Sequence, residues 1–235
     1  MNKHPSLKFR LNRELDNVMA FQFMELSAGG VDFGKRIVEL YPELQKIKEL
    51  NESDKRNEIA NFTNKYYSKN EALLKNILKD IKEDWKSIAN YYFRGVDKTF
   101  GNMAWPEGEY ICYLSIFDCN PRFLEDKTFQ VYFQHMNGTN YVIAHEMLHF
   151  IWFEYFEIYE SRLKNKLDEH TIWLMSEWFN DLVLETKEFR ELVGDSSQGY
   201  PEVIEFSKIF GVFGNNKLNI EGFFDFVKKN LDNEI

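Results

Sequence analysis

The sequence has only two cysteines, Cys112 and Cys119, among its 235 residues. Two cysteines cannot build the disulfide framework of a small secreted domain, and their spacing matches no common zinc-binding pattern. We therefore expect two reduced thiols in a cytoplasmic protein. A single bridge between them is the alternative.

Long hydrophobic runs are also missing. The most apolar stretch, residues 141–156, contains two histidines and two glutamates, whereas a membrane-spanning helix needs roughly 18 uninterrupted apolar residues. The basic N-terminal residues are followed by Arg13, Glu14 and Asp16 before any apolar segment of signal-peptide length. We expect neither a membrane partner nor secretion by a signal peptide.

Positive charge is in deficit, because 29 lysines and arginines stand against 38 aspartates and glutamates, for a net charge of −9 at pH 7. This balance provides no general electrostatic surface for phosphate backbones, so no nucleic-acid partner is expected. A hydrophobic content of 44% and an aromatic content of 17% exclude disorder for most of the chain. The length suffices for one domain or two lobes.

Helical periodicity dominates up to about residue 96. Apolar residues recur at three- and four-residue spacing in residues 31–50 and 70–93, which is typical of amphipathic helices. Glycine, proline and asparagine then cluster in residues 96–109 and end the pattern. We predict a helical N-terminal lobe over residues 1–98 and a second domain over residues 99–235.

The second domain is predicted to begin with a small antiparallel sheet. Residues 110–117 are apolar on both faces, as in an interior strand, and residues 128–134 alternate, as in a half-exposed edge strand. Helices are expected over residues 141–162, 168–187, 201–212 and 220–231. The predicted fold class is therefore α+β and predominantly helical.

The first of these four helices contains His145, Glu146 and His149 in the pattern H-E-x-x-H. Residues four apart share a helix face, so both imidazoles can bind one metal ion, and Glu146 can take a proton from metal-bound water. Chance produces the pattern in roughly one chain in a hundred of this length. The helix is apolar all round and hence predicted to be buried, and a metal would supply the partners that buried polar groups need. Histidines satisfied by other core groups are the alternative.

The motif resembles that of the zincin metallopeptidases. The metzincin continuation, His-x-x-Gly-x-x-His, is absent after His149. Residues 173–181 instead resemble the gluzincin branch, thermolysin and its relatives, in which a following helix carries a glutamate ligand and an aspartate four residues later. The resemblance covers about residues 109–188 and implies a zinc metallopeptidase that acts on a peptide or protein substrate.

Individual roles follow from the resemblance. It implies that His145, His149 and Glu177 bind Zn²⁺, that Glu146 is the general base, and that Asp181 orients His145. It further implies that the strand over residues 128–134 binds extended substrate. No histidine follows His170, so the oxyanion donor of thermolysin-like enzymes has no counterpart. Tyr200 is the candidate, as a tyrosine is in gluzincin aminopeptidases, although a packing role suits it as well.

Several alternatives stay open from the sequence. Glu177 lies in a polar stripe that would also suit the solvated face of a helix, and His170, Glu169 and Glu185 compete with it as third ligand. Glu146-x-x-His149 is also half of the signature of helical-bundle di-metal carboxylate proteins, which need a second such pair that this chain lacks. A binding or regulatory protein that keeps the metal site without turnover is the third possibility.

Overall fold

The computed structural model describes residues 3–196, 199–211, 213 and 218–231. Its residues contact one another within two units that interleave along the chain. Unit 1 comprises Met1–Pro5, Lys86–Glu107 and Ile143–Ile235, and unit 2 comprises Ser6–Trp85 and Gly108–Val142. The change in composition after residue 98 predicts a single boundary there. The change in composition there marks the end of a helix that itself continues from unit 2 into unit 1.

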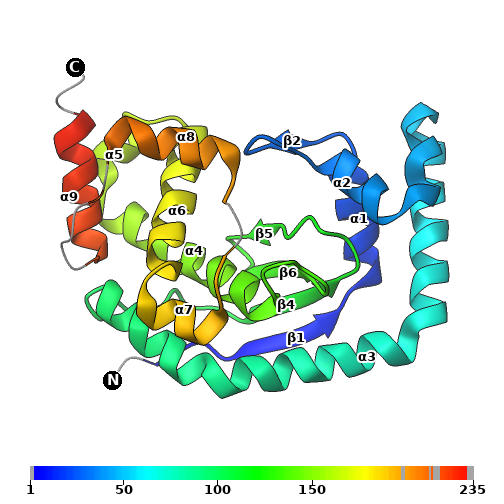
Figure 1. The fold of residues 1–235 in the computed structure, drawn as a ribbon, viewed down its shortest axis with the longest axis horizontal. Coiled ribbons are helices and arrows are strands. Elements are labelled where there is room, and N and C mark those ends of the chain that lie inside the picture. Colours follow the sequence, from blue (N-terminus) through cyan, green and yellow to red (C-terminus); the bar gives the residue numbers. More distant parts are fainter. Residues whose placement is uncertain (1–2, 197–198, 212, 214–217, 232–235) are drawn as a thin grey trace. The chain divides into compact units, whose positions relative to one another are not determined.

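Unit 2 contains a four-stranded sheet with the order β1-β4-β6-β5 (Figure 1). The strands are β1 (Leu7–Leu11), β4 (Tyr110–Ser115), β5 (Arg122–Phe123) and β6 (Thr128–Tyr132). The predicted α+β, predominantly helical class is confirmed. The antiparallel pairing is wrong for the long strands, because β4 runs parallel to both β1 and β6. Within this four-stranded sheet, β5 alone is antiparallel to its neighbour, because the chain reverses direction twice between β4 and β6.

The prediction of an edge strand over residues 128–134 is also wrong, because β6 lies between β4 and β5 and all five of its residues are buried. The polar residue Gln130 made this strand look half exposed in the sequence. Its side chain points into the protein and donates to the Asp16 carboxylate at 2.7 Å, so a polar residue that resembled a solvent-facing one is 1% exposed. Alternation of polar and apolar residues indicates an exposed face only when the polar residues reach water.

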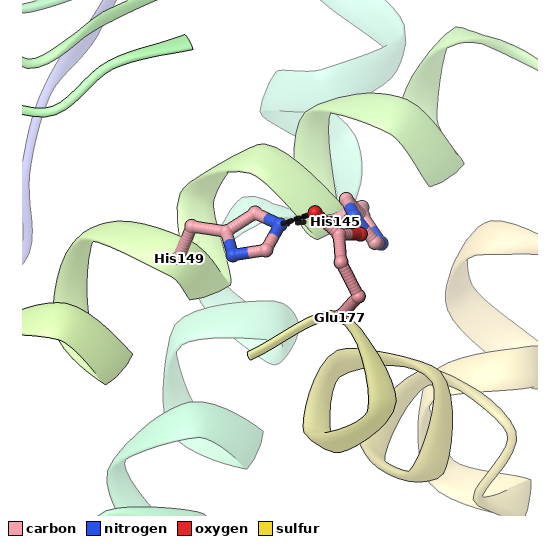
Figure 2. Close-up of side chains that lie close together, drawn as sticks. All are labelled: His145, His149 and Glu177. Atoms are coloured by element: carbon pink, nitrogen blue, oxygen red, sulfur yellow. Dashed lines mark hydrogen bonds and ion pairs between the residues drawn. The ribbon is translucent and has the colours of Figure 1, made fainter. Parts of the chain in front are cut away.

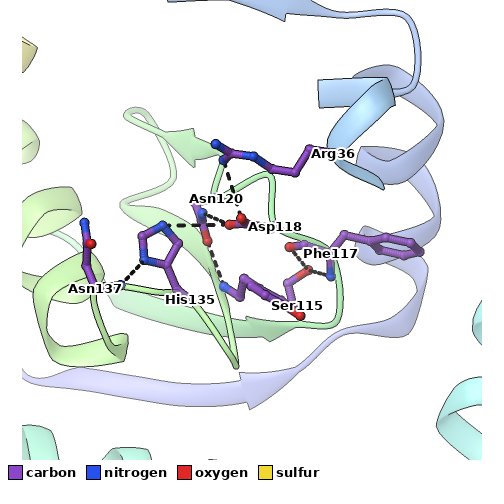
Figure 3. Close-up of polar contacts among 8 residues, drawn as sticks. Arg36, Ser115, Phe117, Asp118, Asn120, His135 and Asn137 are labelled. Carbon is purple, nitrogen blue, oxygen red and sulfur yellow. Dashed lines mark hydrogen bonds and ion pairs between the residues drawn. The ribbon is translucent and has the colours of Figure 1, made fainter. Parts of the chain in front are cut away.

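A polar cluster holds the loop that follows β4 (Figure 3). Asp118 contacts Arg36 at 3.4 Å, the Asn120 amide at 2.9 Å and His135 at 3.8 Å. Asn120 in turn accepts a hydrogen bond from the backbone N–H of Tyr132 at 2.7 Å. The outer backbone of β6 is thus paired with this loop and with β5.

Strand β1 falls in the region predicted to be helical. Leu7, Phe9 and Leu11 alternate with Lys8 and Arg10, which is the two-residue period of a strand, and the burial of the five residues alternates accordingly. Five residues are too few to stand out beside long helical segments. A second, two-stranded sheet pairs β2 (Ser27–Ala28) with β3 (Val31–Asp32).

The helices of unit 2 surround its apolar core. They are α1 (Arg13–Phe23), α2 (Phe33–Leu40), the 3-10 helix η1 (Pro42–Glu49) and the first part of α3 (Glu52–Thr99). The helix predicted over residues 31–50 is divided because Pro42 cannot continue α2. Helix α3 is longer than the predicted segment and has non-helical backbone angles at Asn70. The most buried core members are Ala20, Ile37, Ile59, Leu74 and Ile116.

Unit 1 consists of the end of α3, most of α4 and the helices that follow. These are α4 (Thr139–Tyr159), α5 (Ser161–Lys164), α6 (Glu169–Leu184), α7 (Lys187–Val193), α8 (Pro201–Phe210) and α9 (Ile220–Leu231). The prediction for α9 is confirmed, and that for α8 ends at residue 212, which lies outside the described residues. Helix α6 begins after Asp168, whose side chain accepts from the backbone N–H of Thr171 at 2.8 Å. None of the described helices combines the length and apolarity that crossing a membrane requires.

Candidate metal site

Helix α4 is buried as predicted from its apolar sequence. Ile143, Ala144, Met147, Leu148 and Ile151 are all fully buried. The histidines of the motif lie on the same helix, with the His149 side chain 0% and the His145 side chain 14% exposed. Glu146, between them, is 5% exposed. The site therefore excludes most water while leaving one histidine partly accessible.

Helix α6 brings the third group to this site. The polar stripe that suggested a solvated face is buried, because Ser176 and Asn180 are 0% exposed and Glu177 is 3% exposed. The solvated-face interpretation is therefore wrong. Asn180 donates its side-chain N–H to the backbone carbonyl of His145 at 3.1 Å, which holds α6 against α4. Asn180 belongs to the same polar stripe, but the stripe did not indicate this hydrogen bond to α4.

Helix α3 contacts α4 at the preceding residue. The Tyr92 hydroxyl donates to the backbone carbonyl of Ala144 at 2.8 Å, and Tyr92 is 0% exposed. Two successive carbonyls of α4 thus accept hydrogen bonds from neighbouring helices, one from Tyr92 and one from Asn180. These contacts fix the rotation of α4 about its axis and hence the direction of its histidines.

The three predicted ligands converge in the structure (Figure 2). His145 Nε2 lies 2.9 Å from Glu177 Oε2, His149 Nε2 lies 3.2 Å from Glu177 Oε1, and the two Nε2 atoms are 3.0 Å apart. Among the residues that the structure describes, this is the single group of three or more His, Cys, Asp or Glu side chains arranged to hold a metal ion. The di-metal alternative therefore finds no second site in the described part of the chain.

These separations fit one zinc ion. Ligand atoms at about 2.0–2.1 Å from a tetrahedral zinc lie about 3.3 Å from one another, close to the three distances here. Two imidazole nitrogens and a carboxylate are also the donor set of one class of catalytic zinc sites. His145, His149 and Glu177 thus have the chemistry and spacing to hold the ion.

Electrostatics of the cluster favour positive charge between the three groups. Burial alone would raise the pKa of Glu177, but the two facing imidazoles hold that pKa well below its usual value. Burial alone would likewise lower the pKa of His145, yet the Glu177 carboxylate raises it to about 9. Both shifts arise because a nearby positive charge stabilises a buried carboxylate. A proton on a histidine or a bound metal ion can supply that charge.

Asp181 and Tyr200 lie along the same side of α6 as Glu177. Burial raises the pKa of Asp181 to about 6, while the charge of His145 opposes that rise. A Cβ atom on Gly199 would lie 2.6 Å from Asp181 Oδ2, so the backbone passes directly over this carboxylate. The ring of Tyr200 packs on Trp173, one turn before Glu177, with centroids 5.5 Å apart. Gly199 therefore lies beside α6 one turn after Glu177, and the Tyr200 ring lies beside α6 one turn before Glu177.

The rival ligands do not join the cluster. The His170 side chain is 62% exposed, stacks on Trp173 at 5.7 Å and lies 3.5 Å from Glu202. Glu185 is exposed and accepts from Ser196, and Glu169 is an exposed residue of the first turn of α6. Glu177 is the acidic residue of α6 that reaches both histidines.

Comparison of the chain with family models, with curated proteins and with solved structures finds no match.

Proposed function

We propose that this protein is a zinc metallopeptidase of gluzincin type that hydrolyses peptide bonds in peptides or proteins. One observation carries the proposal: His145, His149 and Glu177 meet in a buried cluster, with the Glu146 carboxylate on the same helix. One buried histidine, one nearly buried histidine and two buried glutamates are expensive to assemble without a ligand that uses them. A metal-dependent hydrolase uses all four.

Each residue has a distinct part in the proposed reaction. Zn²⁺ held by His145, His149 and Glu177 would act as a Lewis acid and lower the pKa of a bound water to about 7. Glu146 accepts a proton from the attacking water while the water oxygen bonds to the substrate carbonyl carbon. Glu146 then returns that proton to the leaving nitrogen as the carbon–nitrogen bond breaks.

Two neighbours would assist this chemistry. Asp181 would orient His145 by its charge, and Tyr200 would donate a hydrogen bond to the developing oxyanion. Tyr200 lies near the site in that its ring packs on Trp173, one turn before Glu177 on α6. We also propose a cytoplasmic location, which the two buried, free thiols of Cys112 and Cys119 support.

Metal analysis and one substitution test the proposal. The purified protein should contain about one Zn²⁺ per chain and cleave blocked peptides from a mixed-sequence library, with cleavage lost on chelation and restored by zinc. Glu146→Gln should keep the zinc and lose hydrolysis by about 100-fold or more, because the amide cannot accept the proton. Glu157→Gln, which alters an exposed glutamate of the same helix, is the matched control and should retain activity.

Other outcomes would assign a different function. Two iron or manganese ions per chain would favour the di-metal carboxylate protein. One tightly bound zinc without cleavage of any library peptide would favour a binding or regulatory protein. Loss of zinc from Glu146→Gln would make Glu146 a ligand and contradict its role as the base.

A further inference from the structure

A concavity of unit 1 lies at the C-terminal end of α4, and none of the metal-site residues lines it. Its volume is about 610 Å³. Its walls come from the segment that follows α3, from the last turns of α4 and from the start of α9. Its lining includes Phe100, Glu107, Glu154, Tyr155, Tyr159 and Glu221.

Aromatic side chains form a fixed wall of this concavity. Tyr155 stacks on Phe224 with centroids 5.6 Å apart and an interplanar angle of 9°, and it contacts Phe100 edge-on at 6.5 Å. Tyr159 packs on Tyr155 at 4.8 Å but is itself 60% exposed. The neighbouring Ile158 is 54% exposed. Tyr159 and Ile158 therefore expose aromatic and apolar surface to solvent, beside the buried ring of Tyr155.

The charged side chains that line the concavity have one sign. Glu107, Glu154 and Glu221 line the concavity, and no lysine or arginine does. None of these three carboxylates forms an ion pair with any residue in the described ranges. Burial raises the pKa of Tyr155 to about 12, and the charges of Glu221, Glu160 and Asp225 add to the rise. The concavity is therefore lined by three acidic side chains and no basic one.

We propose that this concavity docks a basic peptide segment, with a lysine or arginine side chain against the exposed ring of Tyr159 and its charge near Glu154 and Glu221. The methylene stem of such a side chain covers apolar surface while its charged end stays hydrated. An aromatic face attracts the cation, and the unpaired carboxylates supply the complementary charge. The inference does not depend on zinc or on catalysis, because the site shares no residue with the metal cluster.

Binding of a defined peptide tests the proposal. The probe is a fluorescein-labelled, N-acetylated and C-amidated nine-residue peptide with three lysines, measured by fluorescence anisotropy against the full chain carrying Glu146→Gln to prevent cleavage. Adding Glu154→Gln and Glu221→Gln together should weaken binding about 5-fold or more. Glu188→Gln with Glu191→Gln removes the same charge from exposed positions of α7 and should change binding less than about 2-fold. Tyr159→Ala should weaken binding about 3-fold through loss of the ring.

Two control measurements distinguish binding at this concavity from binding at the metal site. A peptide with glutamate in place of each lysine should not bind, and removal of zinc by chelation should leave lysine-peptide binding unchanged. Equal affinity in the Glu154/Glu221 variant and the control variant would overturn the proposal, as would loss of binding on chelation. Thermal melting of each variant distinguishes weakened binding from loss of folding. A chain that lacks peptidase activity but binds the peptide in this way would contradict the proposed function alone.

Discussion

Glu177 presents one carboxylate oxygen to each histidine of the cluster, at 2.9 Å from His145 and 3.2 Å from His149. Its replacement by alanine removes one of the three proposed ligands and leaves the two imidazoles facing each other. We expect Glu177→Ala to abolish tight zinc binding, whereas His170→Ala should bind zinc like the wild type, because His170 is exposed beside Glu202. Titration of each variant with zinc against a competing chelator measures the difference.

The outcome at Glu177 tests the metal site independently of activity. Wild-type zinc affinity in Glu177→Ala would contradict the ligand assignment and with it the gluzincin type. Loss of zinc from His170→Ala would instead restore His170 as a candidate ligand. Circular dichroism of the metal-free variants is the control for folding.

The elements of unit 2 are joined by one buried carboxylate. Asp16 on α1 is 0% exposed and accepts hydrogen bonds from Ser115 at 2.6 Å, Tyr67 at 2.7 Å and Gln130 at 2.7 Å. These donors belong to β4, α3 and β6, so a single side chain links four elements. Burial nevertheless raises the pKa of Asp16 to about 6.

This pKa predicts how the stability of the protein changes with pH. Between about pH 4 and pH 6 the folded state holds a proton on Asp16 that the unfolded state has released, so the free energy of unfolding falls as pH rises through this window. Across this window, the titration of Asp16 changes the free energy of unfolding by about 3 kcal/mol. Asp16→Asn removes it, and the destabilisation by this substitution should therefore be larger at pH 4 than at pH 7.

Urea unfolding of the wild type and the variant at several pH values measures the effect. Asp126→Asn, at an exposed position of the same unit, is the control, and its effect should vary little with pH. A destabilisation by Asp16→Asn that grows from pH 4 to pH 7 would contradict the prediction. It would mean that the hydrogen bonds to Asp16 outweigh its burial and favour its charged form.

At the scale of elements, the sequence was informative where one physical pattern dominated. Helix α4 is apolar all round and α9 has a clear amphipathic period, so both were predicted. The direction of β4 and β6 could not be predicted, because it depends on β5, a strand of two residues. The interior position of β6 was missed because Gln130 pairs with Asp16, more than 100 residues away in the chain.

The same distinction applies to the candidate site. His145 and His149 are four residues apart on one helix, so their common direction follows from helix geometry alone. The meeting of Glu177 with both depends on how α6 packs on α4, and the sequence suggested it only through a family resemblance. The contacts of Tyr92 and Asn180 with the backbone of α4 join distant segments, and no local pattern could have indicated them.

At the scale of the whole molecule, the interleaving of the two units along the chain has a consequence for folding. Unit 1 needs residues 86–107, because Tyr92 bonds to Ala144 and Phe100 packs on Phe179 with centroids 5.6 Å apart. Unit 2 needs its N-terminal segment as well, because β4 pairs with β1 on one side and with β6 on the other. A cut after residue 98 divides both units.

We therefore expect neither residues 1–98 nor residues 99–235 to fold alone. Separating Tyr92 from α4 exposes a fully buried aromatic side chain, and separating β1 from β4 removes a complete strand pairing. Each loss amounts to several kcal/mol, against a total stability of about 5–15 kcal/mol for an ordinary domain. Thermal and urea unfolding should be cooperative for the full chain and absent for each fragment, while an equimolar mixture of the fragments should regain part of the helical signal. Cooperative unfolding of residues 99–235 alone, with zinc affinity equal to that of the full chain, would show instead that the predicted second domain is autonomous.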